Sequence, residues 1–220
     1  MTPIDSPAVR LVTFDLGGVL VRITRTWEEA CALAGVPVHP ATDSPEAWRA
    51  RQPYIHAYER GELGYEAFLE GLAVASGGHY AAAEIERIHH VILREEFPGI
   101  DRLLGDLEAA EVATAILSNT NASHWDAVFS PTGRERFPSV ARVGVPMASH
   151  LLRARKPDAE IFARAEAVTG IRGAEVLYFD DLEDNVKAAR RAGWRSERVD
   201  PTGDPAAEMR AHLVAARVLA

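Results

Sequence analysis

Four polar clusters, far apart in the chain, could act together on a phosphate group. They are Asp15, Ser118-Asn119, Lys156 and Asp180-Asp181, and each one ends an apolar run or precedes a helical pattern. Carboxylates that lie close together raise one another's pKa unless a cation sits between them. Oxygen ligands of this kind suit Mg²⁺, which is commonly shared with a substrate phosphate. The residue types therefore predict a magnesium-assisted phosphate site.

Within such a site each residue type has a chemical use. An aspartate such as Asp15 can attack phosphorus and form an aspartyl-phosphate. Ser118 offers a hydroxyl group, and Lys156 offers a point charge that balances the phosphate. Magnesium screens the approach of one anion to another and stabilises the transition state. Taken singly, the same residues read as turns, a helix cap or a solvated charge; their joint occurrence in this order favours the phosphate site.

A parallel sheet would bring these clusters together. Apolar runs predict strands over residues 9–14, 112–117 and 176–179, and shorter strands over 141–145 and 198–199. Helical spacing predicts helices over 100–110, 158–169, 185–192 and 205–219. Alternating strands and helices predict an α/β fold with a doubly wound, Rossmann-like parallel sheet. Ligands of such sheets bind outside the carboxyl ends of the strands, where all the clusters lie.

The chain between the first two of these strands has a different pattern. Residues 27–34 and most of 45–97 show helical spacing, and we expect no strand in the second block. We therefore expect a core domain of residues 1–22 and 98–220 and an inserted helical cap domain of residues 23–97. The cap is expected to close over the site, with hinges near 22–24 and 97–99. Glu59, Arg60 and Glu62 are its candidates for substrate contact.

The bulk properties limit the possible partners. The 220 residues carry a net charge of -8 and no basic run, which argues against nucleic-acid binding. There is no apolar run long enough for a membrane span and no signal-peptide pattern. The single cysteine, Cys31, excludes an internal disulfide. We expect a cytoplasmic protein whose partner is a small molecule; the sequence does not indicate its oligomeric state.

The clusters resemble the four motifs of the haloacid dehalogenase-like (HAD) superfamily. Residues 14–20 (FDLGGVL) resemble the first motif, 117–121 (LSNTN) the second, 156–157 (KP) the third and 179–185 (FDDLEDN) the fourth. The order is that of the family, and the match spans most of the chain. Residues 56–63 (HAYERGEL) also resemble the helical cap of a bacterial subgroup that includes an α-glucose-1-phosphate phosphatase.

This resemblance implies a magnesium-dependent phosphatase that acts on a small phosphorylated metabolite, with a sugar phosphate as the first choice. Asp15 would be the nucleophile and a metal ligand, and Gly17 would offer its backbone carbonyl to the metal. Lys156 would hold Asp15 and the phosphate together as a catalytic and phosphate-binding residue. Ser118 and Asn119 would bind the transferring phosphate.

The resemblance also implies the rest of the metal site. Asp181 would be a direct Mg²⁺ ligand, and Asp180 and Asn185 would support it from the side or through water. The phosphatases of the family carry a second aspartate two residues after the nucleophile, where this chain has Gly17. General acid–base help of that kind is worth roughly 10²–10⁴-fold. The chain could use another acid, such as a cap residue or His124, could favour good leaving groups, or could be a weak catalyst.

Gly17 bears on three alternative functions. A phosphate-binding or catalytically weak module could use the same fold, because fold does not dictate function. A 2-haloacid dehalogenase also lacks the second aspartate, but its fourth motif gives up carboxylates, whereas this chain keeps Asp180, Asp181 and Asp184. A β-phosphoglucomutase-type transferase is disfavoured, because it uses an aspartate at the position of Gly17.

Overall fold

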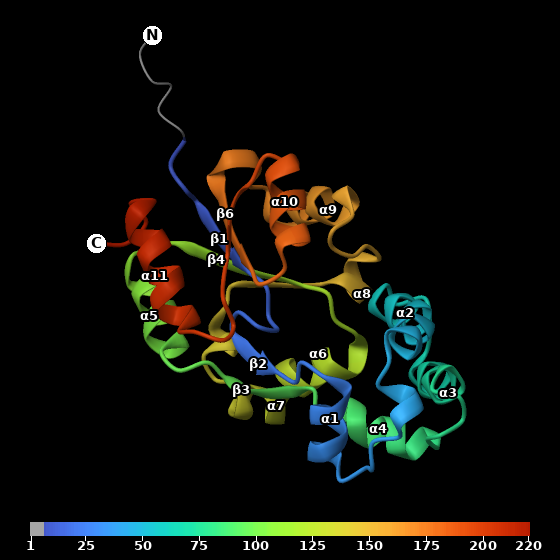
Figure 1. Cartoon of the computed structure of the whole chain (residues 1–220). Coiled ribbons are helices and arrows are strands. Elements are labelled where there is room, and N and C mark those ends of the chain that lie inside the picture. The colour runs from blue at the N-terminus through green and yellow to red at the C-terminus, as the bar shows by residue number, and fades with distance from the viewer. Residues whose placement is uncertain (1–6) are drawn as a thin grey trace.

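A parallel five-stranded sheet forms the centre of the molecule in the computed structural model, which describes residues 7–220 (Figure 1). The first six residues of the expected core domain lie outside the described residues. The strand order is β5-β4-β1-β6-β7. The strands are β1 (Leu11–Phe14), β4 (Ala113–Ser118), β5 (Val145–Ala148), β6 (Val176–Asp180) and β7 (Arg195–Arg198). The predicted α/β fold with a doubly wound parallel sheet is confirmed.

The register of the central strands decides where the polar clusters lie. Phe14 of β1 is paired with Ile116 of β4 on one side and with Phe179 of β6 on the other. The backbone N–H of Asp15 donates to the carbonyl oxygen of Phe179 at 2.8 Å. The carboxyl ends of three strands therefore meet at one edge of the sheet.

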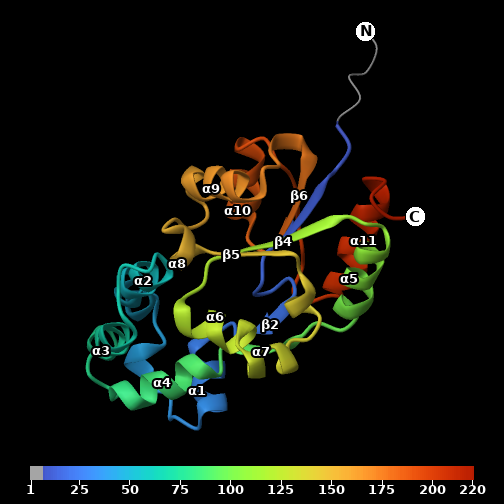
Figure 2. The ribbon, with the colours of Figure 1, turned by 180° about the vertical axis from the view of Figure 1, so that it is seen from behind.

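Helices cover both faces of the sheet (Figures 1 and 2). One face packs against α5 (Ile100–Ala109) and α11 (Pro205–Ala215), and the other packs against α9 (Ala159–Thr169) and α10 (Glu183–Arg191). Side chains of β1 alternate between the two faces, as the two-residue period of a strand requires. Val12 and Phe14 belong to the α5/α11 side and Leu11 to the α9/α10 side.

Four further helices form a separate unit beside the sheet, here called the helical unit. They are α1 (Trp27–Ala34), α2 (Pro45–Glu59), α3 (Tyr65–Ala75) and α4 (Ala82–His90). The unit has its own buried cluster, which includes Cys31, Phe68 and Ile85. In Figures 1 and 2 it lies near α6 (Ala122–Phe129) and α8 (Ser149–Leu152). The remaining elements are α7 (Pro131–Arg136) and 3-10 turns at Pro40–Thr42, Val140–Arg142 and Gly173–Glu175.

Two expectations about strands were wrong. The block from 45 to 97 does contain a strand, β3 (Leu93–Glu96), which pairs antiparallel with β2 (Val21–Ile23). Its pairing partner lies some seventy residues away, so local pattern gave no signal for it. The strand expected at 141–145 is instead β5, which begins at Val145 and contains Pro146. Because β5 is an edge strand, it tolerates a proline that otherwise argues against a strand.

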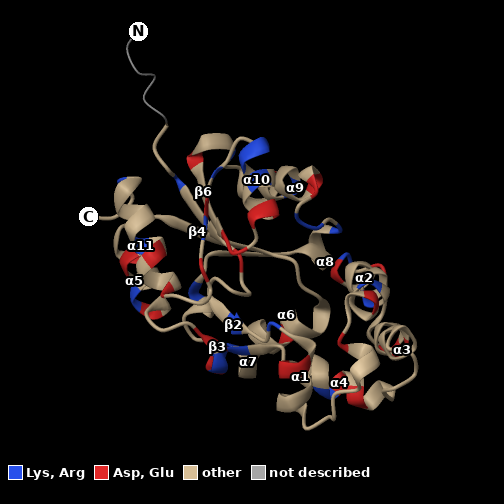
Figure 3. Cartoon of the chain, viewed as in Figure 1, with Lys and Arg blue, Asp and Glu red and all other residues tan. Residues whose placement is uncertain are grey.

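Positively and negatively charged residues are interspersed along the chain (Figure 3). Within residues 7–220, no helix combines the length and the apolar character that crossing a membrane requires.

Candidate active site

Three buried carboxylates converge at the carboxyl edge of the sheet. Asp15 follows β1, Asp180 is the last residue of β6, and Asp181 comes directly after it. Each offers an oxygen, and these three oxygens lie within 4.8 Å of one another. The residues are 8%, 0% and 7% exposed, respectively. Such a group needs nearby positive charge, because carboxylates removed from water repel one another strongly.

Lys156 supplies part of that charge. Its Nζ lies 3.0 Å from Oδ1 of Asp15 and 2.8 Å from Oδ2 of Asp180, and the side chain is fully buried. The same Nζ donates to the hydroxyl oxygen of Tyr178 at 2.8 Å. Burial by itself lowers the pKa of Lys156, but Asp15 and Asp180 outweigh it and raise the pKa. Lys156 is therefore a fixed cation between two of the three carboxylates.

Asp180 is held by several donors. Nδ2 of Asn185 lies 3.0 Å from each of its oxygens, and the backbone N–H of Leu182 donates to Oδ1 at 2.8 Å. The hydroxyl group of Tyr178 also donates to Oδ2. With both oxygens engaged in this way, Asp180 is suited to supporting its neighbours.

The segment after β4 is tied to Lys156. Asn119 Oδ1 accepts a hydrogen bond from the backbone N–H of Lys156, and its Nδ2 donates to the carbonyl oxygen of Lys156, both at 2.8 Å. Ser118 is the buried last residue of β4. Two residues after Ser118, the backbone N–H of Thr120 donates to the hydroxyl group of Ser149, the first residue of α8, and that hydroxyl group donates to the carbonyl oxygen of Thr120. The side chain of Asn119 therefore positions Lys156.

The glycine pair after Asp15 fits tightly against its surroundings. Gly18 has a φ of +81°, and a Cβ atom there would lie 2.7 Å from Oδ2 of Asp181 and closer still to the Arg25 guanidinium group. A Cβ atom on Gly17 would lie 3.2 Å from Cγ2 of Ile23. The place of the family's second aspartate is therefore bordered by the apolar side chain of Ile23.

The electrostatics of the site favour a bound cation. Burial raises the pKa of Asp15 to about 7; Lys156 offsets part of this effect, and Asp180 and Asp181 add to it. Burial also raises the pKa of Asp181, against the hydrogen bond from Arg25. A divalent cation among these oxygens would relieve their repulsion, and hard oxygen donors are the ligands Mg²⁺ prefers. The donor set of Asp15, Asp180 and Asp181 thus fits magnesium.

Other residues of the site differ from the expectation. Asp184 does not belong to the carboxylate group of the described residues, and it lies exposed in the first turn of α10. Tyr178 and Arg25 were not expected. Tyr178 could have been found, since it precedes Asp180 by two residues and so points to the same face of β6. NH1 of Arg25 lies 2.7 Å from Oδ2 of Asp181, and no local sequence pattern predicts this ion pair.

The helical unit reaches the site through Glu59. Its Oε2 accepts from Nε of Arg155 at 3.0 Å and from NH2 at 2.9 Å, and both side chains are less than one-fifth exposed. Arg155 immediately precedes Lys156. Burial raises the pKa of Glu59, and Arg155 offsets part of this effect. The other two candidates for substrate contact, Arg60 and Glu62, pair with each other at 3.0 Å and are more exposed.

His124, considered as a replacement acid, lies in a contact between the helical unit and α6. Its ring stacks on that of His89 with centroids 3.9 Å apart, and its Nε2 donates to the carbonyl oxygen of His89 at 3.0 Å. Its Nδ1 lies 3.3 Å from Nδ2 of Asn121. Burial lowers the pKa of His124 to about 4, so the ring is neutral at pH 7. A neutral ring with both nitrogens engaged is a poor proton donor.

This histidine pair predicts a loss of stability in acid. Both pKa values are lowered by burial, so the stabilisation by the neutral rings is complete above pH 6.5 and is lost as the pH falls towards 4. Urea unfolding is expected to show that His124→Gln loses less stability than wild type over this interval, by up to about 3 kcal/mol. The exposed His79→Gln is the control and should follow wild type. Parallel curves for His124→Gln and wild type would contradict a buried neutral His124.

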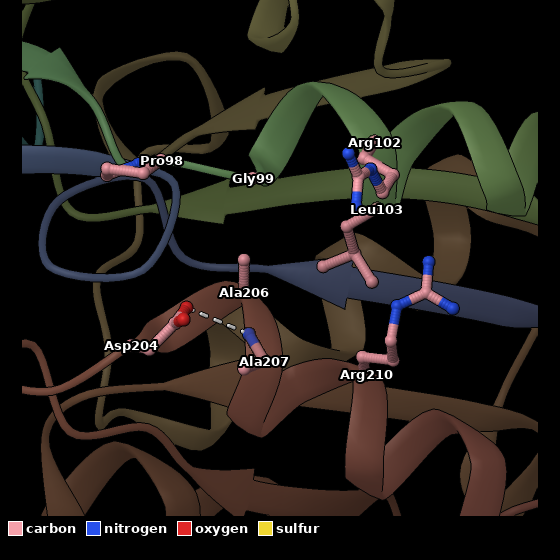
Figure 4. A pocket seen from close by; sticks show the side chains of 8 residues that line it. All are labelled: Pro98, Gly99, Arg102, Leu103, Asp204, Ala206, Ala207 and Arg210. Atoms are coloured by element: carbon pink, nitrogen blue, oxygen red, sulfur yellow. Dashed lines mark hydrogen bonds between the residues drawn. The ribbon is translucent and has the colours of Figure 1, made fainter.

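A hollow lies away from the carboxylates, between the N-terminal ends of α5 and α11 (Figure 4). Its volume is about 320 Å³, and Gly99, Arg102, Asp204 and Arg210 are among its lining residues. Oδ1 of Asp204 already accepts the backbone N–H of Ala207 at 3.0 Å, which caps α11. This hollow shares no residue with the site described above.

The sequence is similar to those of known proteins. A sequence model described as "haloacid dehalogenase-like hydrolase" matches residues 9–193. A curated relative, phosphatase MT3486 of Mycobacterium tuberculosis (strain CDC 1551 / Oshkosh), is 25% identical over 89% of this chain and 89% of its own length. A region of acyl-CoA dehydrogenase family member 10 of Mus musculus is 26% identical over 93% of this chain, which spans 19% of that protein.

Solved structures share the fold. The HAD family enzyme bt-2542 of Bacteroides thetaiotaomicron, in complex with magnesium and inorganic phosphate, has a TM-score of 0.71 and 24% identity, covering 90% of this chain and 97% of that one. L-2-haloacid dehalogenase of Xanthobacter autotrophicus has a TM-score of 0.63 and 20% identity, covering 94% and 83%. The family match covers most of the chain. This protein therefore belongs to the haloacid dehalogenase-like hydrolases.

Proposed function

We propose that this hydrolase is a magnesium-dependent phosphatase that cleaves a small phosphate monoester through an aspartyl-phosphate on Asp15. The observation that carries the proposal is the buried group of Asp15, Asp180 and Asp181, whose oxygens lie within 4.8 Å, with Nζ of Lys156 at 3.0 Å from Asp15. The mycobacterial relative is named a phosphatase, and the Bacteroides enzyme binds magnesium and phosphate, which supports the same reading.

Asp15 is oriented for attack on phosphorus. Its Oδ1 accepts from the backbone N–H of Leu16 at 2.7 Å and from Lys156 at 3.0 Å, which fixes the direction of Oδ2. In the first step an Asp15 oxygen bonds to phosphorus, and the bond from phosphorus to the leaving-group oxygen breaks. In the second step water attacks phosphorus, which releases Asp15 and phosphate. Ser118 and the backbone of Asn119 are proposed to bind the phosphate, and Lys156 to neutralise it.

The proposed magnesium ligands are Asp15, Asp181 and the backbone carbonyl of Gly17, with Asp180 and Asn185 as supporting residues. When bound, the cation supplies positive charge to the transferring phosphate. Gly17 cannot protonate the leaving group, and His124 is a poor donor. We therefore propose that the proton comes from solvent or from the helical unit, which favours esters with good leaving groups.

We further propose that the helical unit is a cap, with residues 23–97 as the cap domain and 1–22 and 98–220 as the core. The unit's contact through Glu59 and Arg155, next to Lys156, supports this division. A sugar phosphate is the proposed substrate class, on the resemblance of residues 56–63 to the cap of a sugar phosphatase.

The Glu59–Arg155 pair should couple the cap to the reaction. Glu59→Gln and Arg155→Gln are each expected to lower kcat/KM about tenfold, because each leaves a poorly solvated partner charge unpaired. The double variant should lose much less than the product of the two effects, since both charges are then removed. The more exposed Arg60→Gln/Glu62→Gln cycle is the control and should show little coupling. If the double variant lost kcat/KM by the full product of the two single effects, the Glu59–Arg155 pair would not couple the cap to the reaction.

The function itself is tested by phosphate release from a panel of esters that includes α-glucose-1-phosphate, with Mg²⁺ and with a chelator. Magnesium-dependent release supports the proposal, and the best ester names the substrate class. A 2-haloacid belongs in the panel, because dehalogenases share the fold. Metal-independent halide release, or no turnover of any ester by folded protein that binds Mg²⁺, would contradict the phosphatase and favour a dehalogenase or a binding module.

A further inference from the structure

Arg25 pairs with Asp181, the one carboxylate of the site that Lys156 does not contact at hydrogen-bond distance. NH1 of Arg25 lies 2.7 Å from Oδ2 of Asp181, whose side chain is 5% exposed, whereas the Arg25 side chain is 41% exposed. Lys156 is shared between Asp15 and Asp180. The ion pair thus joins a buried anion to a cation that reaches in from the surface.

The chain makes room for this guanidinium group. It lies over Gly18, where any side chain would collide with both Arg25 and Asp181. The backbone of Arg25 follows β2 and precedes α1, and its N–H donates to Oε2 of Glu29 at 2.8 Å. Arg25 therefore belongs to the connection through which the chain leaves the sheet and enters the helical unit.

A metal ion bound at this site would interact directly with the charge of Arg25. When all three carboxylates are ionised, they carry one more negative charge than Lys156 and Arg25 balance. A divalent cation at Asp181 would meet the positive guanidinium group within a few ångströms, where like charges repel strongly in a poorly solvated site. The metal must therefore displace Arg25 or bind against its repulsion.

We propose that Arg25 is an internal counter-cation of the magnesium site: it neutralises Asp181 in the metal-free protein and competes with Mg²⁺ for that carboxylate. Arg25 is thus a positioning residue that weakens magnesium binding and links the metal site to the β2–α1 connection. The inference rests on the proposed function only in taking Asp181 as a magnesium ligand.

Calorimetric titration of magnesium chloride into chelator-treated protein tests this directly. Arg25→Gln is expected to bind Mg²⁺ about three- to tenfold more tightly than wild type, the range for losing one partly exposed ion pair. Arg25→Lys, which keeps the positive charge, should return towards the wild-type affinity. Arg22→Gln is the matched control, because Arg22 pairs with exposed Glu95 on the same part of the chain and should leave the affinity unchanged.

Equal or weaker magnesium binding by Arg25→Gln, or no magnesium binding by either protein, would overturn the inference. Circular dichroism of each variant establishes that it is folded before titration. The outcome is separable from that of the phosphatase assay. If no ester is cleaved but Arg25→Gln binds Mg²⁺ more tightly, the proposed reaction fails and the counter-cation stands. If esters are cleaved and the affinities are equal, the reverse holds.

Discussion

Replacement of Lys156 by methionine is expected to destabilise the protein by about 3–5 kcal/mol and to abolish turnover. Methionine has a similar length and no charge, so Asp15 and Asp180 lose the cation that lies 3.0 and 2.8 Å from them. Two buried carboxylates then lie close together without a cation between them, and the hydroxyl oxygen of Tyr178 loses a donor. Urea unfolding monitored by circular dichroism, in the presence of chelator, measures the effect.

The matched control is Lys187→Met. Lys187 pairs with Glu183 on the surface of α10 at 3.5 Å and is 56% exposed, so the change should be within about 0.5 kcal/mol. Equal midpoints for Lys156→Met and wild type would mean that Lys156 does not compensate the carboxylates. A stable but inactive variant would leave Lys156 with a role in turnover alone.

Asp15→Asn is expected to have opposite effects on turnover and on stability. Turnover should be lost, because an amide cannot form the phosphoryl intermediate. The metal-free protein should become more stable by about 1–3 kcal/mol at pH 8. The reason is that the loss of hydration destabilises the buried, ionised Asp15 more than its attraction to Lys156 stabilises it. Its pKa is raised from 3.8 to about 7, so the stability contribution of Asp15 is present at low pH and is lost as the pH rises through this interval.

Thermal unfolding with chelator at pH 8 and at pH 4 provides the measurement. The gain in Tm from Asp15→Asn should be seen at pH 8 and should shrink at pH 4, where Asp15 is largely protonated in wild type. Asp126→Asn, exposed on α6, should leave Tm unchanged at both pH values. A lower Tm for Asp15→Asn at pH 8 would show that the ionised carboxylate stabilises the fold, contrary to this account.

The sequence was sufficient to predict the sheet and the convergence of the polar clusters. Buried strands of a parallel sheet leave an apolar run that stops at a polar residue, and register then brings Asp15 next to Asp180 without further information. Edge elements were less predictable. β5 contains Pro146, a residue that argues against a strand. The polar β3 depends on pairing with β2, which lies far away in the chain.

Contacts between positions far apart in the chain could not be predicted from local pattern. Arg25 on Asp181 and Glu59 on Arg155 join residues separated by 156 and 96 positions. Nothing in the neighbourhood of Arg25 distinguishes it from other arginines, because its role depends on the space above Gly18. His124 illustrates the same limit. Only the fold places the ring of His89 on that of His124 and buries His124, and this burial lowers its pKa.

The central claim, that Asp15 carries the phosphoryl group, is tested most directly by trapping the intermediate. Wild-type protein would be mixed with Mg²⁺ and the best ester of the panel, quenched in acid within one turnover and digested for mass spectrometry. We expect one phosphoryl group on the peptide that contains Asp15, none with chelator, and none on Asp15→Asn. Because Gly17 provides no base for the second step, the intermediate should accumulate. Phosphate release by Asp15→Asn at the wild-type rate, or a phosphoryl group on another residue, would contradict the account.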